Sequence, residues 1–256
     1  MIQVPIEFAD ISEKNNRARQ LTAELEKQVE LFLSSLAGGT EAGGTEWEVR
    51  SDSVVLKSKA RIYAPPSIRI LTGEVLFHLR TLLDHLAWQL ALLATDKPGS
   101  KTEFPVFKDR KIYLSNLRKK IGDLPSEIAQ AIEAEQPFNR DDPESDPLWL
   151  LHQLCNYEKH RMVSVIHATY NDYRIDDAKA NSIVEFSGGT GEGEGGILSV
   201  RKRNDCEPLD LSGLSCSIGL AIANTDNGKN LHLLETIHRC GYRVSEIVLN
   251  FQRFFR

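Results

Sequence analysis

Three polar residues with reactive side chains occur within six positions of one predicted helix. Residues 80–85 read Arg-Thr-Leu-Leu-Asp-His, inside a segment whose apolar residues recur at helical spacing over residues 72–94. Leucines fill one stripe of this helix, so Arg80, Asp84 and His85 are not needed to fill a core. Imidazole titrates near neutral pH and guanidinium matches phosphate oxygens, which suits chemistry on a phosphate ester. Arg80 and Asp84 lie one turn apart and could instead pair locally.

A carboxylate is predicted on the core face of a second helix. The apolar pattern of residues 147–169 places Glu158 in the middle of its apolar stripe. A buried carboxylate is costly unless a cation or several donors meet it, and Arg80 is the partner that we prefer. The pair is either a structural tie between two helices or a catalytic carboxylate with a shifted pKa.

Histidines at helical spacings suggest a metal-binding helical bundle as a further alternative. A di-iron bundle needs two Glu-x-x-His motifs, however, and the sequence has one. Two histidines seven positions apart on a helix are also separated by about 10 Å, too far to bind one ion directly. No metal or other cofactor is therefore predicted. The groups considered are His78 with His85, His160 with His167, and Glu235 with His238.

The spacing from Arg80 to His85 is similar to the Arg-x4–6-His motif of the HEPN superfamily of helical ribonucleases. The resemblance implies metal-independent RNA cleavage, in which the histidine activates the ribose 2′-hydroxyl and the arginine stabilises the phosphorane. It also implies a site that two subunits share. In a regular helix the two side chains point about 140° apart, so they would converge only through a substrate, a helix distortion or a dimer.

A longer resemblance covers about 100 residues, and it looks like an uncharacterised bacterial family with LRxxLDHLxW, FPxF, QPY/F and DKHR segments. Here Glu158 stands where the family pattern has Asp. The resemblance places Arg80, Asp84 and His85 in one constellation with residues 158–161, and it implies no particular activity. The matching segments are LRTLLDHLAW at 79–88, FPVF at 104–107, QPF at 136–138, PLWLL at 147–151 and NYEKHR at 156–161.

Two functions of different classes follow for these residues. In an RNA-cleaving protein the six candidates would act together at one site. In a non-catalytic interaction protein they would be structural ties, and exposed aromatic side chains would carry binding. The catalytic roles would be His85 as general acid or base, His160 as the second acid-base group, Arg80 and Arg161 as phosphate clamps, Glu158 as the orienting carboxylate, and Asp84 as the local partner of Arg80.

The elements that must position these residues predict an α+β fold, a helical bundle of four to six helices with a small flanking antiparallel sheet. We expect a single domain over residues 1–256. Two glycine-rich stretches, at 37–46 and 187–196, are predicted as flexible loops. Helices are expected near 10–35, 72–94, 110–121, 125–135, 147–169 and 231–255, and strands within 47–70 and 182–224.

Composition sets the remaining expectations. With 41% hydrophobic and 26% charged residues, the chain has the balance of a globular protein, and its net charge of −5 argues against a generally basic nucleic-acid coat. The longest apolar stretch, residues 86–94, is about half the roughly 20 residues of a membrane span. We therefore expect a cytoplasmic protein without a membrane partner. RNA and a second copy of the chain are its expected partners.

Overall fold

The computed structural model describes residues 6–37, 45–49, 53–58, 64–160, 165–175, 182–186, 196–202, 214–222 and 231–255. The chain divides into two compact units. The first comprises Met1–Glu26, Arg69–Val163 and Leu234–Arg256, and the second comprises Lys27–Ile68 and Ser164–Leu233. The expectation of a single domain stays a prediction. The predicted loops fall largely at 38–44 and 187–195, outside the described residues.

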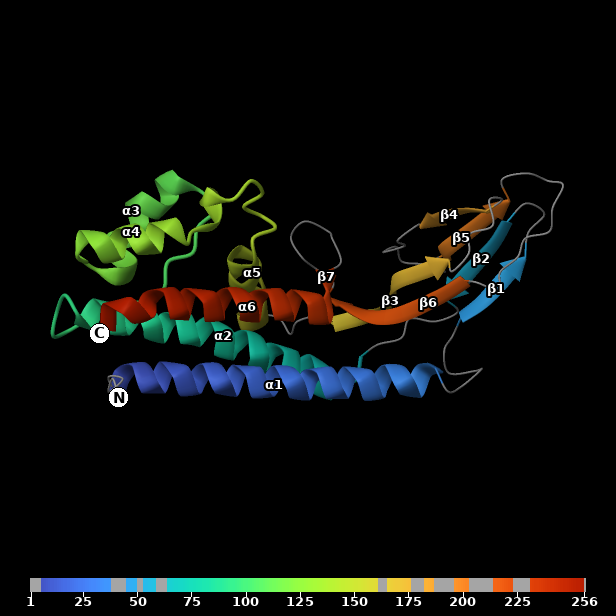
Figure 1. Ribbon diagram of the computed structural model, residues 1–256, viewed down its shortest axis with the longest axis horizontal. Coiled ribbons are helices and arrows are strands. Elements are labelled where there is room, and N and C mark those ends of the chain that lie inside the picture. Colours follow the sequence, from blue (N-terminus) through green and yellow to red (C-terminus); the bar gives the residue numbers. More distant parts are fainter. Residues whose placement is uncertain are drawn as a thin grey trace. The chain divides into compact units, whose positions relative to one another are not determined.

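Helices build the first unit, which contains the candidate site. In it α1, α2 and α6 run side by side (Figure 1). The two short helices expected near 110–121 and 125–135 are confirmed. The helices are α1 (Ile6–Ala37), α2 (Pro66–Leu92), α3 (Arg110–Ile121), α4 (Ser126–Ala134), α5 (Pro147–His160) and α6 (Leu233–Phe251), with short 3-10 helices at Pro137–Asn139 and Gln252–Phe255.

The second unit carries two antiparallel sheets. One has the order β1-β2-β5-β4, so an early strand pair joins a late one, with Ser53 of β2 opposite Arg201 of β5. The other has the order β3-β6-β7. The predicted α+β class, a helical bundle with a small antiparallel sheet, is confirmed. The strands are β1 (Thr45–Val49), β2 (Ser53–Ser58), β3 (Val165–Ile175), β4 (Ser182–Phe186), β5 (Gly196–Lys202), β6 (Leu214–Ile222) and β7 (Leu231–His232).

The helix predicted over residues 147–169 is too long. It ends at His160, and Val165 begins strand β3, which pairs with β6 from Val165 opposite Ile222 to Ile175 opposite Leu214. This segment is rich in β-branched and aromatic residues, which favour a strand once a partner strand is present. The helical pair of His160 and His167 considered for a metal site is therefore wrong, because His167 lies in β3.

Helix α2 begins six residues earlier than predicted. Pro66, which lies in the region 47–70 where strands were expected, opens the helix, and the amide of Ile68 donates to the carbonyl of Pro65. Proline is favoured at the first helical position because its missing N–H has no helical partner there and its φ is already suitable. The early start adds residues 66–71, Ile70 among them, to the helix that carries the candidate site.

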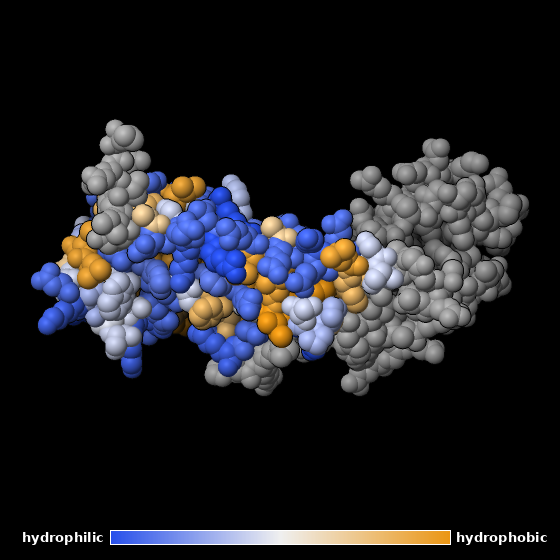
Figure 2. Space-filling model, turned by 90° about the horizontal axis from the view of Figure 1, so that it is seen from below, coloured by the Kyte–Doolittle hydropathy of each residue, from blue (hydrophilic) through white to orange (hydrophobic). Residues whose placement is uncertain are grey.

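The core of the first unit lies where the apolar stripes of its helices meet. The leucine stripe predicted for α2 is buried from Leu79 to Leu90, whereas Leu93 beyond the helix end is exposed. Figure 2 shows one face of this unit as mainly hydrophilic, with separate hydrophobic patches. Among the described helices, none combines the length and the apolar character needed to cross a membrane. Other fully buried core residues are Ile11, Leu25, Leu151, Ile237, Val244 and Ile247.

Candidate functional site

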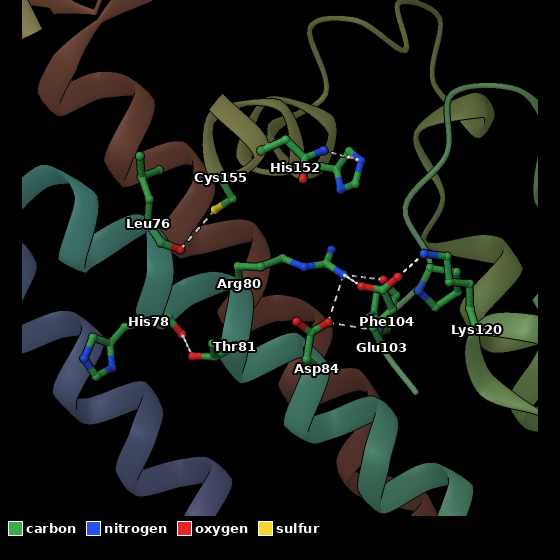
Figure 3. A network of polar contacts seen from close by, with 12 residues as sticks. Leu76, His78, Arg80, Thr81, Asp84, Glu103, Phe104, Lys120, His152 and Cys155 are labelled. Carbon is green, nitrogen blue, oxygen red and sulfur yellow. Dashed lines mark hydrogen bonds and ion pairs between the residues drawn. The ribbon is translucent and has the colours of Figure 1, made fainter. Parts of the chain in front are cut away.

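Arg80 is buried, and its guanidinium binds groups from two separate segments. Its Nη2 atom lies 2.8 Å from Asp84 Oδ1 and donates to the Phe104 carbonyl at 2.7 Å. The same atom lies 3.8 Å from a carboxylate oxygen of Glu103. Figure 3 shows these contacts around the guanidinium. The local pair of Arg80 with Asp84 that the helical spacing allowed is confirmed, and its contact with the segment around residue 104 is new.

Asp84 completes a clamp on the backbone of Phe104. Its Oδ1 atom accepts from the Phe104 amide at 3.0 Å, while Arg80 donates to the carbonyl of the same residue. Residues 102–106 belong to no helix or strand, so their buried polar groups need side-chain partners. Arg80 and Asp84 supply them, which makes the pair a structural tie.

Gln136 holds the other end of this extended segment. It is fully buried, and its Nε2 donates to the carbonyls of Pro105 at 2.8 Å and Ile132 at 3.1 Å. Its Oε1 accepts from the amide of Phe107 at 3.1 Å. We call Arg80, Asp84 and Gln136 the backbone clamp. The clamp joins the LRxxLDHLxW, FPxF and QPF segments, so much of the motif pattern serves to hold one buried chain segment.

Glu158 does not pair with Arg80 as the sequence predicted. Its Oε1 lies against Gly73 of α2, where an added Cβ would be 2.7 Å away. One turn earlier on α5, the thiol of Cys155 donates to the carbonyl of Leu76 at 3.4 Å. Glu158 thus contacts α2 at a residue about 10 Å along the helix axis from Arg80. The ion pairs of Arg80 go to Asp84 and Glu103 instead.

His85 lies on a different side of α2 from the clamp. It is exposed, whereas Arg80 is buried and points toward Phe104. Partial desolvation lowers the pKa of His85, and the positive charge of Lys14 lowers it further, against the opposing effect of Asp84 and Asp10. The structure therefore does not bring Arg80 and His85 together within one chain. The side chain of His160 and all of Arg161 lie outside the described residues.

His152 of α5 is an imidazole close to Arg80 that the sequence did not predict. Figure 3 shows His152 near the Arg80 guanidinium. Burial lowers its pKa to about 4, with further lowering by the charges of Arg80, Lys120 and Lys159, so the ring is neutral at physiological pH. His152 lies three positions after Trp149, and their rings are 5.5 Å apart. Trp149, His152 and Asn156 are spaced by three and four residues, so a helical wheel of α5 would have placed His152 on one side with the other two.

Lys120 of α3 borders the same region. It forms an ion pair with Glu103, and the backbone amide of Glu103 donates to the carbonyl of Lys120 at 2.9 Å. Desolvation lowers the pKa of Lys120, and the charges of Arg80 and Lys159 add to this effect against that of Asp84. Besides its pair with Glu103, the ammonium group of Lys120 thus lies in the electrostatic field of Arg80 and Lys159.

The metal-binding alternative finds no ligand set in the described ranges. Among these residues, no three of the types His, Cys, Asp and Glu are grouped so that they could hold an ion. The histidine of the Glu-x-x-His motif, His238, contacts Glu26 of α1 instead.

Comparison with known proteins adds no relative: no family model, no curated protein and no solved structure matches the chain. The resemblances to the HEPN ribonucleases and to the uncharacterised bacterial family stay predictions.

Proposed function

We propose that the helical unit is a non-catalytic interaction module. The observation that carries this proposal is the backbone clamp, in which Arg80 and Asp84 hold the amide and the carbonyl of Phe104. In the cleaving mechanism Arg80 would have to meet the same phosphate as His85, yet its side chain is 8% exposed, its Nη2 is bound on two sides, and His85 lies on a different side of α2. A structural role accounts for both contacts.

The outward face of α2 supplies a surface for binding. Seven positions recur there at spacings of 4, 3, 4, 4, 3 and 4 residues, which keeps them on one side of a helix for about 33 Å. Phe77 is 60% exposed and Ile70 53%, unusual values for large apolar side chains along one stripe. We call this set the α2 stripe: Ile70, Glu74, Phe77, Thr81, His85, Trp88 and Leu92.

The symmetry of the α2 stripe favours a second copy of the chain as the partner. Its spacings read the same from both ends, with Thr81 in the middle. In an antiparallel pair of α2 helices, Ile70 would meet Leu92 of the other copy and Phe77 would meet His85. The Thr81 hydroxyl already donates to the carbonyl of His78 at 3.2 Å, so its methyl group can face the twofold axis without leaving a polar group unpaired.

Mass measurement by light scattering over a range of concentrations tests this pairing. We expect a dimer for the wild type and a dissociation constant raised by at least about tenfold in Phe77→Ser, since one buried aromatic anchor is worth more than 1.4 kcal/mol. The matched control is Tyr242→Ser on α6, because Tyr242 is 76% exposed and lies outside the α2 stripe. A monomeric wild type, or equal weakening by both variants, contradicts the second-copy partner.

Incubation with mixed RNA, with and without a chelator, tests the catalytic alternative directly. The module proposal predicts no cleavage. Chelator-resistant cleavage that is lost in His85→Ala, with the melting temperature unchanged, would overturn it in favour of the RNA-cleaving function implied by the HEPN resemblance.

A further inference from the structure

Two buried hydrogen-bond donors near His152 lack an acceptor. Among the described residues, neither Nη1 of Arg80 nor Nε1 of Trp149 has a hydrogen-bond partner, although both atoms are buried. The Arg80 side chain is more than nine-tenths buried, so its Nη1 has lost its hydration without gaining a contact. Buried donors are rarely left unpaired, because each one costs the desolvation of its N–H group. Their presence points to an acceptor that the described part of the chain does not provide.

The charges around His152 show what kind of acceptor fits. The positive charges of Arg80, Lys120 and Lys159 all act on this ring. The nearby carboxylates are already engaged, Asp84 by Nη2 of Arg80 and the Phe104 amide, and Glu103 by Lys120. The remaining groups in the same field are Cys155, whose thiol donates to Leu76, and Glu158, which lies against Gly73.

His152 itself fits as a neutral donor. Its Nε2 lies 3.0 Å from Nδ2 of Asn156, and when that amide donates, the single proton of the neutral ring resides on Nδ1. A neutral imidazole, a guanidinium nitrogen and an indole N–H then offer donors from α2 and α5, with the ammonium of Lys120 on α3 beside them. A group that has several acceptor oxygens and carries negative charge satisfies such a set.

We propose that Arg80 Nη1, His152, Trp149 and Lys120, here called the His152 cluster, bind a small oxyanion of the phosphate class. The Lys120 and Glu103 side chains are each 36% exposed, so the cluster reaches the surface through their ion pair. This site uses different residues from the α2 stripe. It goes beyond the proposed function, and either one can fail while the other holds.

Calorimetric titration of the full-length chain at constant ionic strength tests the site. The probes are inorganic phosphate and AMP, which separate a free anion from a phosphomonoester, with chloride as the reference anion. We expect saturable binding of at least one probe. Lys120→Gln should weaken it by about tenfold, the loss expected for one charge-assisted contact. Lys119→Gln removes an exposed neighbouring charge on the same helix and should leave the affinity unchanged.

Proton NMR provides a second readout that a general charge effect would not reproduce. A bound anion stabilises the imidazolium, so saturating phosphate should raise the pKa of His152 and leave that of His85, on a different side of α2, unchanged. Trp149→Phe keeps an aromatic side chain but removes the indole N–H together with the five-membered ring, and it should weaken binding without unfolding the protein. Absence of saturable binding, or equal weakening by Lys119→Gln and Lys120→Gln, would overturn the proposal and leave water as the acceptor for both donors.

Discussion

The two sides of α2 present different residues in opposite settings. On one side Arg80 and Asp84 are tied to the backbone of Phe104, and Arg80 is buried. On the other side His85 and Phe77 are exposed along the α2 stripe. The first side has polar groups occupied by the protein itself, and the second has apolar groups that the chain leaves uncovered. Burial therefore separates the structural residues of this helix from those available to a partner.

The difference between the two sides of α2 is tested most strongly by a substitution at Arg80. Arg80→Ala leaves the Phe104 carbonyl and the Asp84 carboxylate without their cation, and we expect the free energy of unfolding to fall by about 3–5 kcal/mol, as for a broken buried pair. His85→Ala, five positions along the same helix, should change it by less than about 0.5 kcal/mol. Urea unfolding of both variants measures the contrast. Equal effects would show that the two sides do not differ in their structural role.

Gln136, at the other end of the backbone clamp, allows the same contrast between a buried and an exposed side chain to be measured. Gln136→Ala removes three hydrogen bonds from a fully buried site and leaves the Pro105 carbonyl and the Phe107 amide unpaired. The expected loss is about 2–4 kcal/mol. Gln130→Ala on the exposed face of α4 is the matched control and should be nearly neutral. A loss below about 0.5 kcal/mol for Gln136→Ala would mean that water replaces the amide.

The pH dependence of stability should show the buried setting of His152. Its pKa is about 4 in the folded protein, below the ordinary value of 6.5, so the unfolded chain binds more protons between these values. Stability is therefore fully present above the ordinary pKa and is lost as pH falls toward about 4. The wild type should lose up to about 3 kcal/mol more than His152→Gln over this window. Parallel pH profiles of the two proteins would contradict the burial of the ring.

The smallest expected effect concerns the contact of Glu158 with Gly73. A Cβ at Gly73 meets the end of a flexible side chain, which can move, while alanine favours the helix by up to about 1 kcal/mol over glycine. Gly73→Ala should thus change stability by less than about 1 kcal/mol. In a Glu158→Ala background the same change should be more favourable. Thermal melts of the four proteins in this cycle give the coupling, and strict additivity would show that the contact is absent.

Local features of the site could be predicted from the sequence because they depend on helical spacing alone. The pair of Arg80 with Asp84 follows from a separation of four residues, and α3 and α4 follow from their boundary residues. Partners distant in sequence could not be predicted this way. The sequence predicts a pair of Glu158 with Arg80 because it places both near the core. The contact that forms depends on the point along α2 where α5 crosses it. The spacing of residues within one helix gives no information about that point.

The helix predicted over residues 147–169 is too long for the same reason, because a partner distant in sequence decides the structure of its second half. Residues 165–169 are compatible with a continued helix until their pairing with β6 is known, and this partner lies about 50 residues further along the chain. His152 was missed for a different reason. Its significance comes from Arg80 and Lys120 on two other helices, whose charges act on it only in the folded unit.

The segment from Phe104 to Phe107 has a consequence for hydrogen exchange. Its two end amides donate to side chains of Asp84 and Gln136, which are 20 and 29 residues away in the sequence. Fraying of a nearby helix end does not release these amides, because neither belongs to a helical ladder. Their exchange with deuterated solvent requires α2 or the end of α4 to separate from the segment. Two amides in an irregular stretch thus become protected reporters for the cooperative opening of the helical unit.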